Sequence, residues 1–376
     1  MSYYHQNVDR QISAEAGDVY LSPPELINDL ATIIHHLTSK TRSPDLIWDP
    51  AAADGRLLEP CIEQGYHVMN SDLNPTHVAV EKIDFLHEAK RPVSTAETLW
   101  MVFNPPFALP GQKNGVTTFL NHSDALMVPG EYAICIAPIT FSNYNVLGKV
   151  NKNLHLVEEH YIRRNIKFFQ PSTGKKKQVH IVIHVWQKRN RPSPTHGIHN
   201  RLKLTNKEEA TLPFKIRPSH RDSDERPSFF VMRRFTGKDV GMTLTSDRVV
   251  GKVCRKGRKT ISNPLCSTYV TKNVTFGSSN FSTIFAVHSK KKTNLLGTFH
   301  TLYTTGMYAR YLGYGMHQGV QTISMTAMKY MAMYPEKVPS RQSLGIKINF
   351  IGDKAKIAVD KEHMLTQQYF YDQFFA

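Results

Sequence analysis

Four consecutive residues, Asn104-Pro105-Pro106-Phe107, offer the clearest chemistry in this chain. They follow the apolar run 99–103, which predicts a buried strand, and the two prolines must end that strand in a rigid turn. The exocyclic amino group of a purine is a poor nucleophile, because its lone pair is conjugated with the ring. The Asn104 side-chain oxygen and the Pro105 carbonyl can accept its two hydrogens, and Phe107 can stack on the base. The alternative for so short a motif is an ordinary strand-ending loop with a buried phenylalanine.

Three further segments predict a nucleotide-like pocket beside this turn. The apolar run 46–50 leads into the small-residue turn and helix start 51–58, an arrangement that cradles a nucleotide. The run 68–72 predicts a strand that ends in an acid, Asp72, which can accept both hydroxyls of a ribose. Residues 83–86 then place Asp84 beside the aromatic Phe85, a possible clamp for adenine.

These segments resemble class I S-adenosylmethionine-dependent methyltransferases with an NPP(Y/F) catalytic motif, and most closely the gamma-class N6-adenine DNA methyltransferases of the TaqI type. The family's DPACGSG motif is matched by residues 49–55, and its catalytic motif by residues 104–107. Residues 20–25 resemble the family's (T/S)PPE segment, which lines the methionine end of the cofactor. The resemblance is specific over about residues 15–188 and keeps the gamma-class order of segments.

The resemblance implies an α/β fold, with a Rossmann-like methyltransferase domain on a mostly parallel seven-stranded sheet and a second, basic α+β domain. It implies S-adenosylmethionine as cofactor, bound by Tyr20, Ser22, Pro23, Asp49, Ala51, Ala53, Gly55, Asp72, Asp84, Phe85 and Asn104. The catalytic residues would be Asn104, Pro105, Pro106 and Phe107. A later aromatic, Phe169 or its neighbour Phe168, would stack on the other face of the target base.

The first glycine of the family's cofactor motif is replaced here by Ala53, and Asp54 stands where a serine is usual. Glycine is favoured where the backbone must adopt a positive φ or approach a ligand closely. Ala53 can therefore narrow the cofactor pocket or weaken binding, while Gly55 is retained. This departure motivates an alternative, a nucleic-acid-binding subunit with a catalytically degenerate methyltransferase fold.

Charge divides the chain into two unlike parts. Residues 1–150 carry nine Lys and Arg against 17 Asp and Glu, whereas residues 151–376 carry 38 against 14. A basic excess of this size predicts a polyanionic partner, and we expect nucleic acid, DNA rather than RNA. The predicted division is a flexible N-terminus over 1–14, a catalytic domain over 15–188, a linker over 189–200 and a basic target-recognition-like domain over 201–376.

Clusters of lysine and arginine are the candidate contacts to the nucleic-acid backbone. They are Lys175, Lys176 and Lys177, beside the predicted stacking aromatic, and Arg255, Lys256, Arg258 and Lys259. Each cluster is also typical of a solvated surface. In the same half, residues 229–232, 249–253 and 282–288 predict strands, and residues 322–333 predict a helix.

Several classes of protein are disfavoured by composition. The four cysteines, Cys61, Cys135, Cys254 and Cys266, show no paired CxxC spacing, so neither a metal site nor a disulfide framework is predicted. No apolar stretch approaches the length of a membrane span, and no signal-peptide pattern is present. We therefore expect an intracellular protein.

The predicted reaction is methylation of the N6 amino group of adenine in DNA with base flipping, as in restriction-modification. Related chemistry keeps alternatives open, because guanine N2 in RNA, adenine N6 in RNA and the glutamine side chain all present a conjugated amino group. The basic half disfavours the glutamine alternative. A complex whose partner supplies DNA recognition also remains open.

Overall fold

The computed structural model describes residues 20–107, 109, 114–162, 166–171, 173–179, 181–218, 229–232, 234–235, 248–250, 267–269, 284–289, 321–322 and 325–352. The chain forms two compact units, each described by itself. The first contains residues 1–141, 145–197 and 345–357, and the second contains residues 142–144, 198–344 and 358–376. The predicted flexible N-terminus, 1–14, lies outside the described residues.

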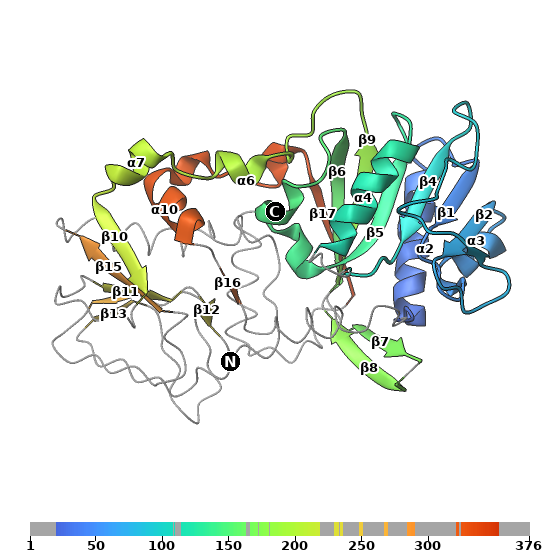
Figure 1. The fold of residues 1–376 in the computed structure, drawn as a ribbon, viewed down its shortest axis with the longest axis horizontal. Coiled ribbons are helices and arrows are strands. Elements are labelled where there is room, and N and C mark those ends of the chain that lie inside the picture. Colours follow the sequence, from blue (N-terminus) through green and yellow to red (C-terminus); the bar gives the residue numbers. More distant parts are fainter. Residues whose placement is uncertain are drawn as a thin grey trace. The chain divides into compact units, whose positions relative to one another are not determined.

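An eight-stranded sheet forms the centre of the first unit, with strand order β17-β6-β9-β5-β4-β1-β2-β3 (Figure 1). Its strands are β1 (Leu46–Asp49), β2 (Val68–Asp72), β3 (Glu81–Lys82), β4 (Leu99–Phe103), β5 (Tyr132–Pro138), β6 (Leu154–Ile162), β9 (Ile181–Lys188) and β17 (Lys347–Ile351). All neighbours pair in parallel except β9, which is antiparallel to both β5 and β6. Chain order reverses between β1 and β4. In open α/β sheets, ligands bind at such a switch point, outside the carboxyl ends of the strands.

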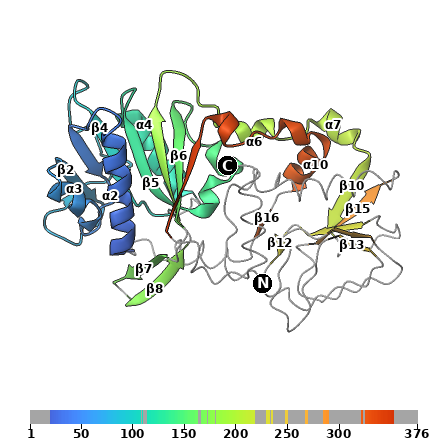
Figure 2. The ribbon, with the colours of Figure 1, turned by 180° about the vertical axis from the view of Figure 1, so that it is seen from behind.

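Helices cover both faces of this sheet, which explains why β4 is an unbroken apolar run with all five residues buried. Helix α2 (Pro24–Thr38) lies on one face, with η1 (Arg56–Leu58) and α3 (Glu59–Glu63), and is in front in Figure 2. Helix α4 (Gly115–Leu126) lies on the other face, in front in Figure 1. The short elements η2 (Ile139–Ser142) and α5 (Tyr144–Leu147) follow β5.

The sequence of α2 accounts for its placement. Pro24 stands at the first helical position, where its missing N–H costs nothing. Its apolar residues recur every three or four positions, so one stripe is buried against the sheet. The buried side chains are Leu26, Ile27, Leu30, Ala31, Ile33, Ile34 and Leu37. The helix therefore fixes the segment 20–23 that precedes it.

Strands β7 (Ile166–Gln170) and β8 (Lys175–Val179) form a separate antiparallel hairpin between β6 and β9. The residues of β7 alternate between a buried and an exposed face, as strand geometry requires. An isolated bridge joins Leu21 to Phe169, through Leu21 N–H to Phe169 O at 2.8 Å and Phe169 N–H to Leu21 O at 3.2 Å. The hairpin is thereby attached to the segment before α2.

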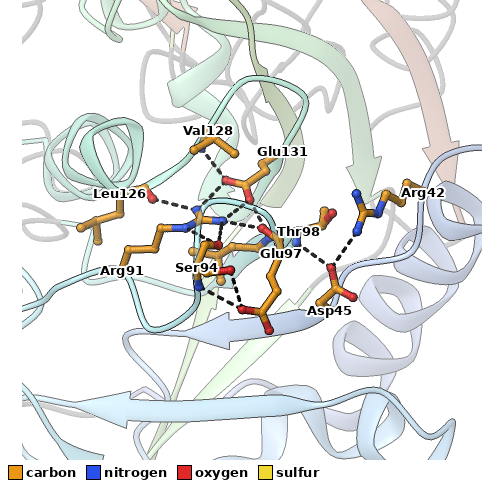
Figure 3. Close-up of polar contacts among 10 residues, drawn as sticks. Arg42, Asp45, Arg91, Ser94, Glu97, Thr98, Leu126, Val128 and Glu131 are labelled. Carbon is orange, nitrogen blue, oxygen red and sulfur yellow. Dashed lines mark hydrogen bonds and ion pairs between the residues drawn. The ribbon is translucent and has the colours of Figure 1, made fainter.

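A buried ion-pair network lies at the amino ends of β4 and β5 and links them (Figure 3). The Arg91 guanidinium donates to both carboxylate oxygens of Glu131, at 2.7 and 2.9 Å. Glu131 also accepts the backbone N–H groups of Leu99 and Val128, each at 2.6 Å. This network lies at the edge of the sheet opposite Asn104 and serves to hold the strands.

The second unit contains a five-stranded antiparallel sheet, two further strands and short helices. Its described elements are α6 (Ile198–Arg201), α7 (Asn206–Ala210), β10 (Phe214–Pro218), β11 (Phe229–Met232), β12 (Arg234–Phe235), β13 (Arg248–Val250), β14 (Ser267–Tyr269), β15 (Ile284–Ser289), β16 (Gln321–Thr322), α10 (Met325–Met333), η5 (Pro335–Lys337) and η6 (Gln342–Leu344). The sheet order is β10-β15-β11-β14-β13, and β12 pairs with β16. The strand predicted over 229–232 is confirmed with both of its bounds.

One part of the predicted domain division differs from the structure. Residues 345–357 were expected in the basic domain over 201–376, but they belong to the first unit. There β17 pairs in parallel with β6, with Lys347 opposite Glu158 and Phe350 opposite Tyr161. An edge strand of five residues has too little local signal to reveal which sheet it joins, because its partner lies almost 190 residues earlier.

Candidate active site

Asn104 stands directly after β4, at the switch point of the sheet, where the two prolines end the strand. Its side-chain Nδ2 donates a hydrogen bond to Ser22 Oγ at 3.1 Å. Ser22 is buried, with 5% of its surface exposed, whereas Asn104 is half-buried. The fold thus joins the predicted catalytic motif to the (T/S)PPE-like segment 82 residues earlier.

Two acceptors of the motif remain available. Asn104 Oδ1 and the Pro105 carbonyl receive no hydrogen bond from any residue that the structure describes. By contrast, the Phe107 carbonyl accepts the Gly115 N–H at 3.1 Å. Two neighbouring acceptors without a donor among the described residues suit a ligand that brings two N–H donors of its own.

The turn is packed tightly against the first residue of α4. A Cβ atom at Gly115 would lie 2.0 Å from the Pro106 carbonyl oxygen and 3.3 Å from the Phe107 carbonyl carbon. Only glycine allows the backbone of 106–107 to approach this closely. The sequence analysis did not identify Gly115, and no local signal distinguishes it from Gly111, since the contact arises only when α4 packs on the turn.

The three aromatic candidates occupy different positions. Phe168 is buried in the core, and its ring meets that of half-buried Phe107 edge to face, with centroids 6.3 Å apart. Phe169 is 38% exposed and lies on the opposite face of β7. Phe168 is therefore placed to support Phe107, and of the two neighbours Phe169 is the one with a ring available for a ligand.

The turn after β1 has a positive φ at Ala53, the position where the motif that it resembles has glycine. Ala53 has a φ of 53°, the only positive φ of a non-glycine residue in the described part of the chain, and Gly55 has a φ of 83°. The Ala53 N–H donates to Asp72 Oδ2 at 2.9 Å, and its carbonyl accepts the Thr76 N–H at 2.9 Å. The turn is thus held in place although alanine replaces glycine.

Two acids border this turn. Asp72, at the end of β2, accepts one backbone N–H on each carboxylate oxygen, from Ala53 and Asn74, and each oxygen can accept another bond. Asp49 is fully buried, and its Oδ1 accepts the Ala51 N–H at 2.9 Å. Its Oδ2 is buried and has no hydrogen-bond partner among the described residues. Burial raises the pKa of Asp49 well above the usual range, and the nearby Asp72 charge adds to this effect.

Asp84 and Phe85 mark the adjacent loop. Asp84 accepts the Leu86 N–H at 3.1 Å and pairs with His87 Nδ1 at 2.9 Å. Burial raises the pKa of Asp84, but the hydrogen bonds from His87 and Leu86 outweigh it, and the net pKa is lowered. The Phe85 ring is 3% exposed and contacts the rings of Trp48 and Phe119. It therefore anchors this loop to the core.

The lysines of β8 do not share one environment. Lys175 and Lys176 are exposed, and Lys176 stands opposite Phe169 across the hairpin. Lys177 points inward, with its Nζ buried and 5.4 Å from the centroid of the Tyr20 ring. The predicted contacts Arg255, Lys256, Arg258 and Lys259 lie outside the described residues.

The class of fold follows from the sheet. Strand order β3-β2-β1-β4-β5-β9-β6, with only β9 antiparallel, is that of the Rossmann-like fold of class I methyltransferases. The predicted α/β fold is confirmed. The structure adds β17 to the seven predicted strands.

Comparison with known proteins gives structural likeness without sequence matches. No protein-family model and no curated sequence matches the chain. A putative class I S-adenosylmethionine-dependent methyltransferase from Listeria monocytogenes is similar over 46% of this chain and 63% of its own length, at 16% identity and a TM-score of 0.34. A putative RNA methyltransferase from Pyrococcus horikoshii is similar over 50% and 100%, at 13% identity and a TM-score of 0.35.

The methyltransferase subunit of a type I restriction-modification system from Streptococcus thermophilus is similar over 48% of this chain and 47% of its own length, at 13% identity and a TM-score of 0.37. The chain thus spans less than two thirds of two of these three proteins. Among the described residues, no helix is both long and apolar enough to cross a membrane.

Proposed function

We propose that this protein transfers a methyl group from S-adenosylmethionine to the N6 amino group of adenine in DNA. The observation that carries the proposal is the pair of acceptors at the end of β4. Asn104 Oδ1 and the Pro105 carbonyl accept no hydrogen bond from the described residues, and they stand at the switch point of the sheet. An exocyclic amino group, with two hydrogens, is the complement of that pair.

The residues around the turn after β1 fit the proposed cofactor. S-adenosylmethionine supplies a methyl group on a positively charged sulfur. Asp72 would accept the ribose hydroxyls, and the turn 51–55 would lie along the amino-acid portion. The buried Asp49 Oδ2, which has no partner among the described residues, fits a ligand that carries positive charge and N–H donors.

Catalysis would come mainly from orientation and electrostatics. Asn104 Oδ1 and the Pro105 carbonyl would hold the amino hydrogens and favour a pyramidal nitrogen whose lone pair points at the methyl group. Phe107, supported by Phe168, would stack on one face of the base, and exposed Phe169 on the other. No strong general base is needed, because the nitrogen becomes acidic once it is methylated.

DNA is the proposed substrate because residues 151–376 carry 38 Lys and Arg against 14 Asp and Glu. Within a duplex the amino group is hidden from this geometry. The target adenine would therefore be flipped out of the stack, at a cost of a few kcal/mol. Lys175 and Lys176 are exposed beside Phe169 and would contact the phosphates flanking the flipped base.

The test is transfer of a labelled methyl group from S-adenosylmethionine to DNA and to RNA, followed by separation of the nucleosides by mass spectrometry. We expect N6-methyladenine in DNA, with Asn104→Ala slower by about 10²-fold or more. A folded Asn104→Ala protein with full turnover would contradict the role of Asn104. Label in RNA would keep the site and change the substrate. No label, together with no cofactor binding by calorimetry, would favour the degenerate subunit.

A further inference from the structure

The amide of Asn104 has two unlike ends, and only one of them is useful in the proposed reaction. Its oxygen accepts hydrogen bonds, and its nitrogen only donates them. A rotation of 180° about the last side-chain bond exchanges the two ends, and the two arrangements have nearly the same shape. The catalytic geometry therefore requires that the side chain be held where its oxygen can meet the substrate amino group.

In the structure, Ser22 holds this side chain through a hydrogen bond. Asn104 Nδ2 donates to Ser22 Oγ at 3.1 Å, so Oδ1 is directed elsewhere, and it receives no hydrogen bond from the described residues. If the amide rotated, Nδ2 would replace Oδ1 as the atom presented to the substrate amino group. Two sets of N–H donors would then face each other, which is unfavourable.

The backbone around Ser22 is fixed on both sides. Leu21 makes two backbone hydrogen bonds with Phe169, at 2.8 and 3.2 Å. The Pro23 carbonyl accepts the N–H groups of Leu26 and Ile27 at the start of α2, at 3.0 and 3.2 Å. Ser22 itself is 5% exposed. A buried hydroxyl on an anchored backbone can hold a neighbouring side chain in place.

We propose that Ser22 is a positioning residue that holds the Asn104 side chain where its carboxamide oxygen can accept from the substrate amino group. This inference rests on the proposed function and assigns Ser22 a role other than lining the cofactor. Leu21, the residue before Ser22, forms the bridge to Phe169. The segment 21–22 therefore positions both the Asn104 carboxamide and the exposed Phe169 ring. Ser22 acts through Asn104 and takes no part in the bond changes.

Kinetics of Ser22→Ala and Ser22→Thr test the proposal, with Thr32→Ala as the matched control. Thr32 is an exposed residue of α2 whose hydroxyl bonds only to Asn28 O, at 2.9 Å, among the described residues. We expect Ser22→Ala to lower kcat about 10- to 100-fold, with the dissociation constant of S-adenosylmethionine changed by less than about threefold. Ser22→Thr should restore most of kcat, and Thr32→Ala should match the wild type.

Three kinetic results would overturn the proposal. They are an unchanged kcat in Ser22→Ala, a loss confined to cofactor affinity, and a loss of kcat that Ser22→Thr does not relieve. Failure of the proposed function is distinguishable, because the wild-type protein would then methylate no nucleic acid.

A second measurement does not depend on turnover. In protein labelled with ¹⁵N-asparagine, the carboxamide resonances of Asn104 are identified by their absence in Asn104→Ala. We expect them to shift in Ser22→Ala and to stay in place in Thr32→Ala. Unchanged resonances in Ser22→Ala would show that the hydroxyl does not hold the amide, whatever the substrate of the protein.

Discussion

At residue 53 the backbone adopts a conformation that side chains disfavour. With a φ of 53°, the Cβ of Ala53 lies too near the following carbonyl oxygen, which costs about 1–2 kcal/mol. We expect Ala53→Gly to stabilise the protein by about 1 kcal/mol, after the greater entropy of glycine in the unfolded chain is subtracted. Urea unfolding measures this. Ala51→Gly, at a residue without a positive φ, should instead destabilise, and equal effects would contradict the strain argument.

Gly115 controls the backbone of the proposed catalytic turn. In Gly115→Ala the new Cβ would lie 2.0 Å from the Pro106 carbonyl oxygen, so the turn must move by about 1 Å. A displacement of this size should lower kcat about 10²-fold, while the circular dichroism spectrum stays that of the wild type. Thr118→Ala, one turn further along α4, is the control. Wild-type kcat in a folded Gly115→Ala protein would refute the contact.

At the scale of elements, the amino ends of β4 and β5 depend on one buried carboxylate. Side-chain exposure is 3% for Glu131 and 13% for its partner Arg91. Glu131→Gln leaves the Arg91 charge without its partner, and we expect a loss of about 3–5 kcal/mol in the free energy of unfolding. Exposed Glu97→Gln is the control, with a loss below about 1 kcal/mol. If Glu131→Gln also lost less than about 1 kcal/mol, the network would contribute little to the free energy of unfolding.

Two elements position the proposed chemistry together. Strand β7 alternates its faces, so Phe168 enters the core and supports Phe107 while Phe169 stays exposed. Helix α2 begins two residues after Ser22 and anchors the segment that contacts both Asn104 and Phe169. The sequence favoured Phe169 and kept Phe168 as the alternative, because a shift of one residue in register exchanges the two faces.

At the scale of the molecule, the chain leaves the first sheet after β9 and returns to it as β17. The return is held by a polar cluster on β6, where Glu158 pairs with His160 at 2.9 Å and Lys347 at 3.4 Å, and accepts from Asn349 at 3.2 Å. Burial raises the pKa of Glu158, but the bonds and charges of His160 and Lys347 outweigh it and lower the pKa to about 2.

This cluster predicts an acid-sensitive attachment of β17. Because the pKa of Glu158 is lower in the folded state, its contribution is complete above the unfolded pKa of about 4.5 and is lost as pH falls toward 2. The contribution is at most about 3 kcal/mol. Unfolding free energies of wild type and Glu158→Gln should therefore differ at pH 6 and converge near pH 2. A difference independent of pH would contradict the prediction.

The sequence by itself determined the local elements and predicted the chemistry at their ends. Apolar runs gave the strand bounds of 68–72 and 99–103, and the prolines after Asn104 ended the second of these. Such features depend on residues within a few positions of one another, so a linear pattern contains them. The same holds for the strained turn at Ala53, which its place in a glycine motif already indicated.

Only the tertiary structure decided which distant residues meet. It brought Ser22 to Asn104 across 82 residues, placed Gly115 against Pro106, exposed Phe169 rather than Phe168, and returned β17 to the first sheet. These contacts depend on how helices and strands pack over a shared core. Packing is a property of whole faces, and many residues far apart in the chain contribute to each face, so no single segment specifies its partner.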